Sequence, residues 1–270
     1  MRLMTTSTVN SIQDYWQQRA AESEGSQAAT TNDVYLRELE IKTIVSTVKS
    51  LERRPTTLLD VGCGDGYSTL AVAGELPDIA VRGIDYSSRM IEIARSRVAR
   101  ERGPAGRVRF DVGDALDLES SLGTASFDLI VTDRCLINLP SLEFQTCAIN
   151  QIANHLSPRG HYLAIENFAE GQQHLNAARA AMGLAPIPVR WHNRFFTNDE
   201  FMSAAQGAFE VVEEKDFSSA YYFATRVIYS AMCQMRCEQP DYQHEIHRRA
   251  VDLPWTGQFS PIRMIVLRRK

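Results

Sequence analysis

The chain has 270 residues, of which 44% are hydrophobic, and a formal net charge of −4 at pH 7. These values are ordinary for a soluble globular protein with a full core, and the net negative charge gives no electrostatic footprint for nucleic acid. Because no run of about 18 apolar residues predicts a membrane span, and five cysteines without framework spacing predict free thiols, we expect a cytoplasmic protein with neither a nucleic-acid nor a membrane partner.

Two helices are predicted before the first strand, over residues 9–22 and 33–52, because apolar residues recur there at helical spacing. Strands and helices alternate from residue 56 onward, which specifies a mostly parallel sheet with helices on both faces. The strands are predicted over 56–61, 80–85, 107–112, 127–132, 160–166, 208–214 and 262–267, and the helices between the first five over 66–75, 87–101 and 141–155.

The predicted fold class is therefore α/β, a doubly wound, mostly parallel sheet of seven strands within a single domain. Residues 1–53 are the N-terminal helical segment, and residues 54–167 are the cofactor-binding core. Insertions after the fifth and sixth strands, residues 168–196 and 217–261, are expected to form a helical cap. The segment 218–229 within the second insertion is apolar at helical spacing, which fits either a helix packed on the sheet or a lid over a substrate.

The first predicted strand ends in an acid followed by three alternate glycines, in the segment Asp60–Gly66. Glycine tolerates positive φ and has no Cβ, so the backbone can approach a ligand closely. The spacing is G-x-G-x-G, whereas the turn that holds a dinucleotide pyrophosphate reads G-x-G-x-x-G. An acid directly before the first glycine suits a cationic ligand group, such as the α-amino group of a methionine moiety. The segment therefore favours S-adenosylmethionine over a dinucleotide.

Acids also follow the next three strands. Asp85 ends the second strand, where a carboxylate can accept hydrogen bonds from both ribose hydroxyls, although this feature alone would serve NAD as well. Asp114 follows the third strand and can accept from an adenine amino group. Asp133 ends the fourth strand, which opens toward the reactive centre. Four such motifs in order at βαβ spacing are a specific signal of a nucleoside-cofactor site.

On these motifs, residues from about 56 to 166 resemble the core of the class I S-adenosylmethionine-dependent methyltransferases. The resemblance implies that the Asp60–Gly66 loop surrounds the methionine part, that Asp85 binds ribose and that Asp114 lies near adenine, which Tyr86 and Met90 flank. In the N-terminal helices, Arg37 is a candidate for the cofactor carboxylate and Tyr15 for closing over the cofactor, although either fits a surface or core position equally. The candidate cofactor residues are Tyr15, Arg37, Asp60, Gly62, Cys63, Gly64, Gly66, Asp85, Tyr86, Met90, Gly113, Asp114, Ala115 and Asp133.

Candidate acceptor residues lie mainly outside this core, notably in Trp191-His192-Asn193. An alcohol acceptor needs its proton removed, which histidine can do near neutral pH, whereas an amine needs only to arrive unprotonated. His192 is therefore a candidate base and Asn193 a candidate for orienting the acceptor; the alternative is that His192 caps a loop and Trp191 belongs to the core. The candidate substrate residues are Asn138, Asn167, Trp191, Asn193, Tyr221 and Tyr222.

Acids at strand ends offer a second mechanism, with Asp133 and Glu166 as candidate catalytic residues beside His192. Some catechol-type and sugar O-methyltransferases bind Mg²⁺ with acids at similar places, and the ion lowers the pKa of the hydroxyl. Here Glu166-Asn167 stands where catechol-type members have Asp-Asn, and Arg134 would compete with a cation, so no metal is expected. The segment 244–247, His-Glu-Ile-His, lacks zinc-protease spacing and is predicted to be a solvated face.

The leading hypothesis is an S-adenosylmethionine-dependent methyltransferase acting on a hydroxyl or amine of a small molecule, such as a sugar, an amino acid or a secondary metabolite. Three alternatives stay open: a metal-assisted O-methyltransferase, a non-catalytic S-adenosylmethionine-binding protein, and a dinucleotide-dependent oxidoreductase. The expected partner is the small-molecule acceptor, with a homodimer as one option.

Overall fold

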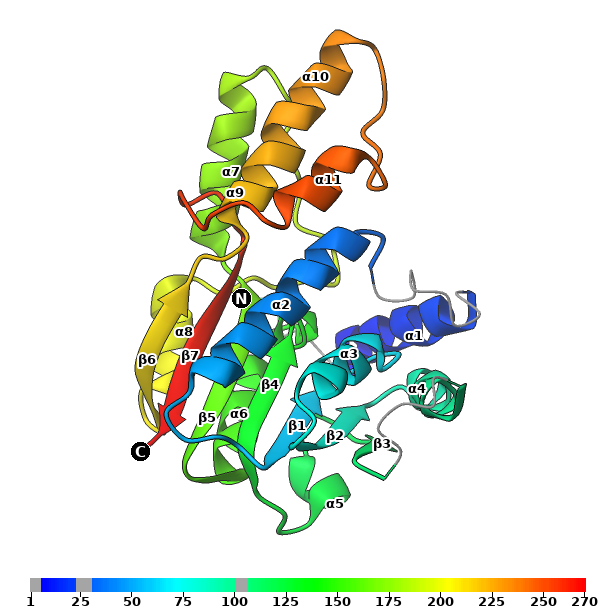
Figure 1. Ribbon diagram of the computed structural model, residues 1–270, viewed down its shortest axis with the longest axis vertical. Coiled ribbons are helices and arrows are strands. Elements are labelled where there is room, and N and C mark those ends of the chain that lie inside the picture. Colours follow the sequence, from blue (N-terminus) through cyan, green and yellow to red (C-terminus); the bar gives the residue numbers. More distant parts are fainter. Residues whose placement is uncertain (1–5, 23–30, 101–105) are drawn as a thin grey trace.

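A seven-stranded sheet runs through the molecule and carries helices on both faces (Figure 1). The computed structural model describes residues 6–22, 31–100 and 106–270. Strands β1 to β5 pair in parallel, and β7 runs antiparallel to both β5 and β6. The sheet has the order β3-β2-β1-β4-β5-β7-β6, with β1 Thr57–Val61, β2 Ala80–Asp85, β3 Val108–Val112, β4 Phe127–Asp133, β5 Leu156–Asn167, β6 Phe209–Lys215 and β7 Ile262–Arg269.

This architecture confirms the predicted doubly wound α/β sheet. Successive residues of a buried strand point to opposite faces, so Leu58 and Leu59 of β1 enter two different cores, and both are buried. Helices α2, α3 and α4 cover one face, and α5, α6 and α8 cover the other. The bounds of these helices are α2 Val34–Ser50, α3 Tyr67–Glu75, α4 Ser88–Arg100, α5 Leu118–Leu122, α6 Leu142–Asn154 and α8 Asn198–Ala205.

A helical cap extends beyond the sheet, at the top of Figure 1. It consists of α7 from the first predicted insertion and of α9, η2, α10 and α11 from the second. The run from α9 to α10 is continuous, and its middle part, η2, winds as a π-helix. The bounds are α7 Ala169–Ala181, α9 Ser219–Tyr222, η2 Phe223–Ile228, α10 Tyr229–Met235 and α11 Glu245–Ala250.

The helix α1 (Thr6–Glu22) lies apart from α2, the other described helix of the N-terminal segment, and contacts α4. Its Ala20 packs with Met90 of α4, and the Ser87 hydroxyl donates a hydrogen bond to Gln17 Oε1 at 2.9 Å. Residues 1–5 and 23–30 of the predicted N-terminal segment, and residue 101 of the predicted helix 87–101, lie outside the described ranges.

Most predicted elements agree with the structure to within a few residues, and the differences have local causes. The short helices α5 and η1 (Leu136–Asn138) were not predicted, because three to five residues are too few to show a period. Strand β5 begins at Leu156, before the predicted residue 160. Its pairing with β4 shifts register between Phe127 and Leu129, so the strand continues through Arg159 although that residue has a positive φ.

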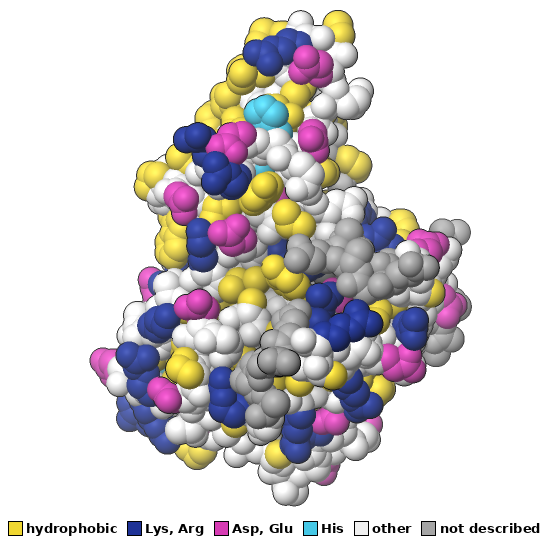
Figure 2. Space-filling view, turned by 45° about the vertical axis from the view of Figure 1, so that its right-hand side comes forward, with side chains coloured by type: hydrophobic (Ala, Val, Ile, Leu, Met, Phe, Trp, Pro, Cys, Tyr) yellow, Lys and Arg dark blue, Asp and Glu magenta, His cyan; other side chains and the backbone are white. Residues whose placement is uncertain are grey.

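The described residues also show the state of the cysteines, the character of the helices and the distribution of surface charge. All five cysteines are free, as predicted. None of the helices within the described ranges combines the length and apolarity that crossing a membrane requires. On the face shown in Figure 2, basic and acidic side chains are interspersed over both the sheet region and the cap.

The turn from β1 to α3 generates a stability prediction. Gly66 has a φ of 73°, and a Cβ there would lie 2.7 Å from the Ala94 Cβ of α4. Gly66→Ala is therefore expected to lower the free energy of unfolding by about 2 kcal/mol, measured by urea denaturation. Gly74→Ala is the matched control: Gly74 lies inside α3 with open space around it, so alanine should raise stability by up to about 1 kcal/mol. Equal effects of the two substitutions would contradict this account of the turn.

Candidate functional site

A cavity of about 570 Å³ opens at the carboxyl ends of β1, β2, β3 and β4. The four acids that follow these strands in the sequence, Asp60, Asp85, Asp114 and Asp133, all line it. This is the edge at which open α/β sheets bind ligands. Helix α1, the start of α2 and parts of the cap form the other walls.

The glycine loop closes one end of the cavity through backbone contacts. The N–H groups of Gly62 and Cys63 both donate to the carbonyl of Ile84 in β2, at 2.8 and 3.0 Å. Gly62 has a φ of 78°, and a Cβ there would lie 2.4 Å from Cys135 Sγ, so the loops after β1 and β4 meet without room for a side chain. Gly64, also at positive φ, lines the cavity, whereas Gly66 does not.

Asp85 joins the loops that follow β1 and β2. Its carboxylate accepts hydrogen bonds from the Gly64 N–H at 3.0 Å and the Ser87 N–H at 2.8 Å. Burial raises the pKa of Asp85 to about 6, so the group is ionised at neutral pH and its remaining lone pairs can accept from a ligand. Next to it, the buried hydroxyl of Tyr86 has no hydrogen-bond partner among the described residues.

The carboxyl group of Asp60 is buried and has a pKa near neutral pH. It accepts a 2.5 Å hydrogen bond from the Thr69 hydroxyl of α3. Burial raises the pKa of Asp60 to about 7, and the nearby carboxylates of Asp133 and Asp85 act in the same direction. A cationic group placed beside Asp60 would favour the ionised form.

Two arginines partly balance these acids. Arg37 of α2 is buried over the Tyr67 ring, at 5.1 Å from its centroid, and lines the cavity as its candidate role required. Arg134, which follows Asp133 with a φ of 53°, binds Glu40 of α2 through Nε at 3.0 Å and Nη2 at 3.1 Å. Burial raises the pKa of Glu40, and the Arg134 guanidinium opposes that rise. Sequence reasoning missed Glu40, although its position three residues after Arg37 places it on the same face of α2.

Glu166 does not line the cavity. It is fully buried, and its two oxygens accept hydrogen bonds from the N–H groups of Leu136 and Ile137 at 3.1 and 3.3 Å, so it supports the turn after β4. Burial raises the pKa of Glu166 to about 8.

Its neighbour Asn167 does line the cavity, with a buried Oδ1 that has no hydrogen-bond partner among the described residues. No group of three or more His, Cys, Asp or Glu side chains in the described ranges is arranged to hold a metal ion.

Helix α1 meets the first insertion in an aromatic cluster over the cavity. The His192 ring stacks on the Tyr15 ring with centroids 4.4 Å apart, and the Trp16 ring meets it edge-on at 5.6 Å. His192 is 4% exposed, and its Nδ1 has no partner among the described residues. Burial and the nearby Arg190 and Arg19 lower the pKa of His192 to about 4, so its ring is neutral at pH 7.

Asn138 of η1 links this cluster to the sheet. Its Oδ1 accepts from Trp16 Nε1 at 3.1 Å and from Asn193 Nδ2 at 3.2 Å, while its Nδ2 donates to the carbonyl of Arg134 at 2.8 Å. Both amides line the cavity. Trp191 does not: it is 65% exposed, and its ring lies nearly perpendicular to the Tyr15 ring, with the two centroids 5.7 Å apart.

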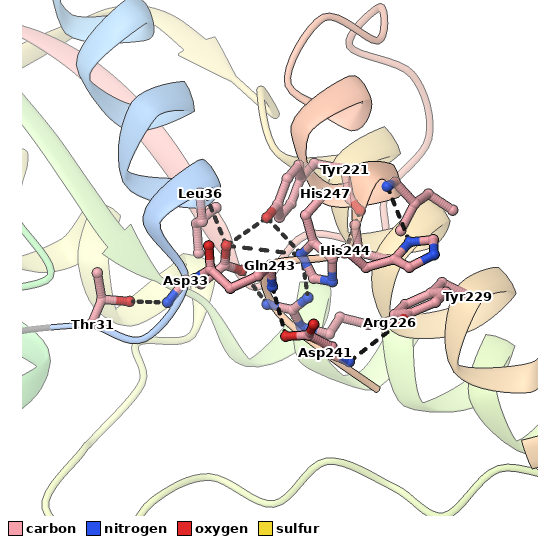
Figure 3. Close-up of polar contacts among 12 residues, drawn as sticks. Thr31, Asp33, Leu36, Tyr221, Arg226, Tyr229, Asp241, Gln243, His244 and His247 are labelled. Carbon is pink, nitrogen blue, oxygen red and sulfur yellow. Dashed lines mark hydrogen bonds and ion pairs between the residues drawn. The ribbon is translucent and has the colours of Figure 1, made fainter. Parts of the chain in front are cut away.

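The two adjacent tyrosines of α9 have different environments. Tyr222 lines the cavity. Tyr221 is buried behind it, and its hydroxyl donates to Asp33 Oδ1 at 2.6 Å (Figure 3). His247 of α11 lies in the same group of contacts and is 1% exposed, so the predicted solvated face over 244–247 is wrong at this residue. Helix α11 packs against η2 and α2, which a six-residue helix cannot reveal by its period.

Of the sequence-predicted site residues, the structure brings eighteen around one cavity, which the remaining four do not line. Those that line it are Tyr15, Arg37, Asp60, Gly62, Cys63, Gly64, Asp85, Tyr86, Met90, Gly113, Asp114, Ala115, Asp133, Asn138, Asn167, His192, Asn193 and Tyr222; those that do not are Gly66, Glu166, Trp191 and Tyr221.

The chain is similar to known proteins over the part that forms most of this cavity. A sequence-family model described as a methyltransferase domain matches residues 53–206. The chain is 44% identical over 101 residues to the O-methyltransferase cnsE of Penicillium expansum, covering 37% of this chain and 34% of that protein. It is 40% identical over 92 residues to the ajmaline N-methyltransferase of Rauvolfia serpentina, covering 34% of this chain and 30% of that protein.

These matches thus span about a third of the length of both curated relatives. Among solved structures, the magnesium protoporphyrin IX methyltransferase of Synechocystis PCC 6803 with bound S-adenosylhomocysteine is similar over 97% of this chain and 99% of its own, with a TM-score of 0.63. At 14% identity, this likeness establishes the fold.

The burial of Glu166 generates a prediction of pH dependence. In the unfolded chain this carboxyl ionises near its ordinary pKa of 4.5, while in the folded protein burial raises its pKa to about 8. The stability contributed by the protonated form is present below pH 4.5 and is lost as the pH rises toward 8, with an upper limit of about 5 kcal/mol. Glu166→Gln should therefore flatten part of the decline in melting temperature between pH 5 and 8. Glu143→Gln, at an exposed carboxyl with a lowered pKa, should leave the slope unchanged.

Proposed function

Since this chain belongs to the methyltransferase-domain family, we propose that it transfers a methyl group from S-adenosylmethionine to a hydroxyl or amine of a small molecule. The acceptor would be a sugar, an amino acid or a secondary metabolite. The relatives named above are an O-methyltransferase and an N-methyltransferase, which supports both acceptor atoms. The proposal extends to a cytoplasmic protein without nucleic-acid or membrane partners, and the homodimer remains one option to test.

The observation that carries the proposal is the set of acids at successive strand ends around a glycine-rich loop. Asp60 and Arg37 both line the cavity, and in this proposal Asp60 would bind the α-amino group of the methionine part and Arg37 its carboxylate. Asp85 would hold the ribose hydroxyls and Asp114 the adenine. The missing Cβ at Gly62 and the unpartnered Tyr86 hydroxyl fit a ligand that lies directly against this loop.

S-adenosylmethionine supplies an electrophilic methyl group on a sulfonium, so the protein has mainly to position the acceptor and exclude water. Tyr15 and Trp16 close one side of the cavity, and Tyr222 contributes to another wall. The amides of Asn138, Asn167 and Asn193 supply oriented donors and acceptors that can fix a polar acceptor.

His192 is the proposed base. Because its pKa of about 4 keeps the ring neutral at pH 7, the unpartnered Nδ1 can accept a hydrogen bond from an acceptor O–H or N–H group. The imidazole would then take the proton as the acceptor atom forms its bond to the methyl carbon and the bond from that carbon to sulfur breaks, with S-adenosylhomocysteine as the leaving group. Asp133 and Glu166 are not assigned this role, since Asp133 lies 3.6 Å from the Arg134 guanidinium and Glu166 supports a turn.

Cofactor binding is tested by calorimetric titration with S-adenosylhomocysteine. We expect micromolar binding to the wild type, and Asp85→Asn should weaken it about tenfold or more because charge-assisted hydrogen bonds to the ribose are lost. Asp252→Asn, at an exposed residue of the cap, is the control and should bind as the wild type does. Preference of the wild type for NAD⁺ would instead support the oxidoreductase.

The role of His192 is tested by His192→Phe, which keeps a ring against Tyr15 and removes the nitrogen. With an acceptor found by screening hydroxyl- and amine-bearing small molecules for S-adenosylhomocysteine release, kcat should fall about a hundredfold. The affinity for S-adenosylhomocysteine should not change. His174→Gln, at an exposed histidine of α7, is the control. Unchanged turnover in His192→Phe would remove His192 from the mechanism, and an absence of turnover with any acceptor would favour the non-catalytic alternative.

A further inference from the structure

A second cavity of about 250 Å³ lies within the helical cap. Ile187, Arg226 and Tyr242 line both this cavity and the larger one, so the two spaces adjoin at these residues. The second cavity thus lies next to the space in which the acceptor would be bound. The other residues that line it are Arg179, Thr225, Ser230, Pro240 and His247.

Arg179 of α7 is held in place by backbone carbonyls alone. Its Nη1 donates to the carbonyl of Arg226, and its Nε donates to the carbonyl of Ala185 at 2.8 Å. No acidic side chain of the described residues forms an ion pair with it. Because an arginine stays protonated in proteins, this guanidinium brings a positive charge to the cavity wall that no carboxylate balances.

Arg226, the other arginine of this wall, is balanced. Its guanidinium forms an ion pair with Asp33 (Figure 3). It also lies 4.7 Å from the centroid of the Tyr242 ring. Burial and Arg226 lower the pKa of His247 to about 4, so that imidazole adds no charge at pH 7. Asp241 lies nearby, but it does not line the cavity, and its exposed carboxylate accepts the N–H of Gln243 at 2.9 Å.

The backbone around Arg226 is unusual as well. Residues Phe223–Ile228 wind as a π-helix, a rare conformation that recurs at functional sites. The Arg226 carbonyl binds the Arg179 side chain, and the Thr225 hydroxyl donates to the Tyr221 carbonyl at 2.7 Å. The π-helix and Arg179 thus fix each other in position on the cavity wall.

We propose that the second cavity binds an oxyanion carried by the methyl acceptor, a carboxylate or a phosphate, with the Arg179 guanidinium as its ligand. A planar guanidinium is suited to paired hydrogen bonds with such groups, and a partly enclosed wall strengthens the attraction by excluding water. The inference rests on the proposed function, since it assigns one end of the acceptor whose other end meets His192. It narrows the acceptor to small molecules with an acidic group.

The test uses the full chain saturated with S-adenosylhomocysteine, so that the amino-acid end of the cofactor site is filled. Succinate and inorganic phosphate are titrated calorimetrically, with succinamide as the uncharged match for succinate. We expect binding of at least one anion, no binding of succinamide, and a loss of affinity of about tenfold or more in Arg179→Gln. The stronger of the two anions identifies the acidic group. Arg236→Gln, at an exposed arginine of the cap, should bind as the wild type does.

A second variant keeps the test decisive if Arg179→Gln loses the fold of the cap. Ser230→Leu leaves both arginines in place and fills the cavity, so it should also abolish anion binding. Wild-type affinity in either folded variant, or no anion binding to a wild type that binds S-adenosylhomocysteine, would overturn the inference while leaving the proposed function intact. Failure to bind S-adenosylhomocysteine at all would instead count against the proposed function.

Discussion

The burial of several carboxylates around one cavity is the constraint on which the rest of this site depends. Parallel strands bring their carboxyl ends to one edge, so Asp60, Asp85, Asp114 and Asp133 face a common space. Burial removes water from the charged carboxylates and so raises the pKa values of Asp60 and Asp85. Repulsion from neighbouring carboxylates raises these pKa values further. A ligand with a cationic end and several hydroxyl donors relieves that cost.

The protein supplies part of the compensation itself. Backbone N–H groups meet Asp85, a hydroxyl meets Asp60, and Arg134 lies beside Asp133. The helix α2 supplies Glu40 to hold Arg134 in place. This balance explains why a helix that precedes the family core in the chain belongs to the architecture of the site.

The sequence predicts which residues after β1 to β4 meet at the cavity, because the signals of these residues are local. An acid at a strand end and glycines at alternate positions are readable within the segment 60–66, and strand order then brings successive segments together. The acceptor end depends on contacts between distant segments. Asp33 meets Tyr221 and Arg226 across nearly two hundred residues, and adjacent Tyr221 and Tyr222 separate into different environments. Trp191 and His192 separate in the same way, since a loop has no period that indicates which side chain turns inward.

The stretch that matches the methyltransferase-domain family ends at residue 206, whereas most of the second cavity is built by the segment from Thr225 to His247. With the proposed roles of the two cavities, donor binding and acceptor choice would be encoded largely in separate parts of one chain. Asp33, the N-cap of α2, couples them through Arg226. A division of this kind makes acceptor preference an exchangeable trait: the cap can diverge, or be replaced by design, while the catalytic edge of the sheet is inherited unchanged.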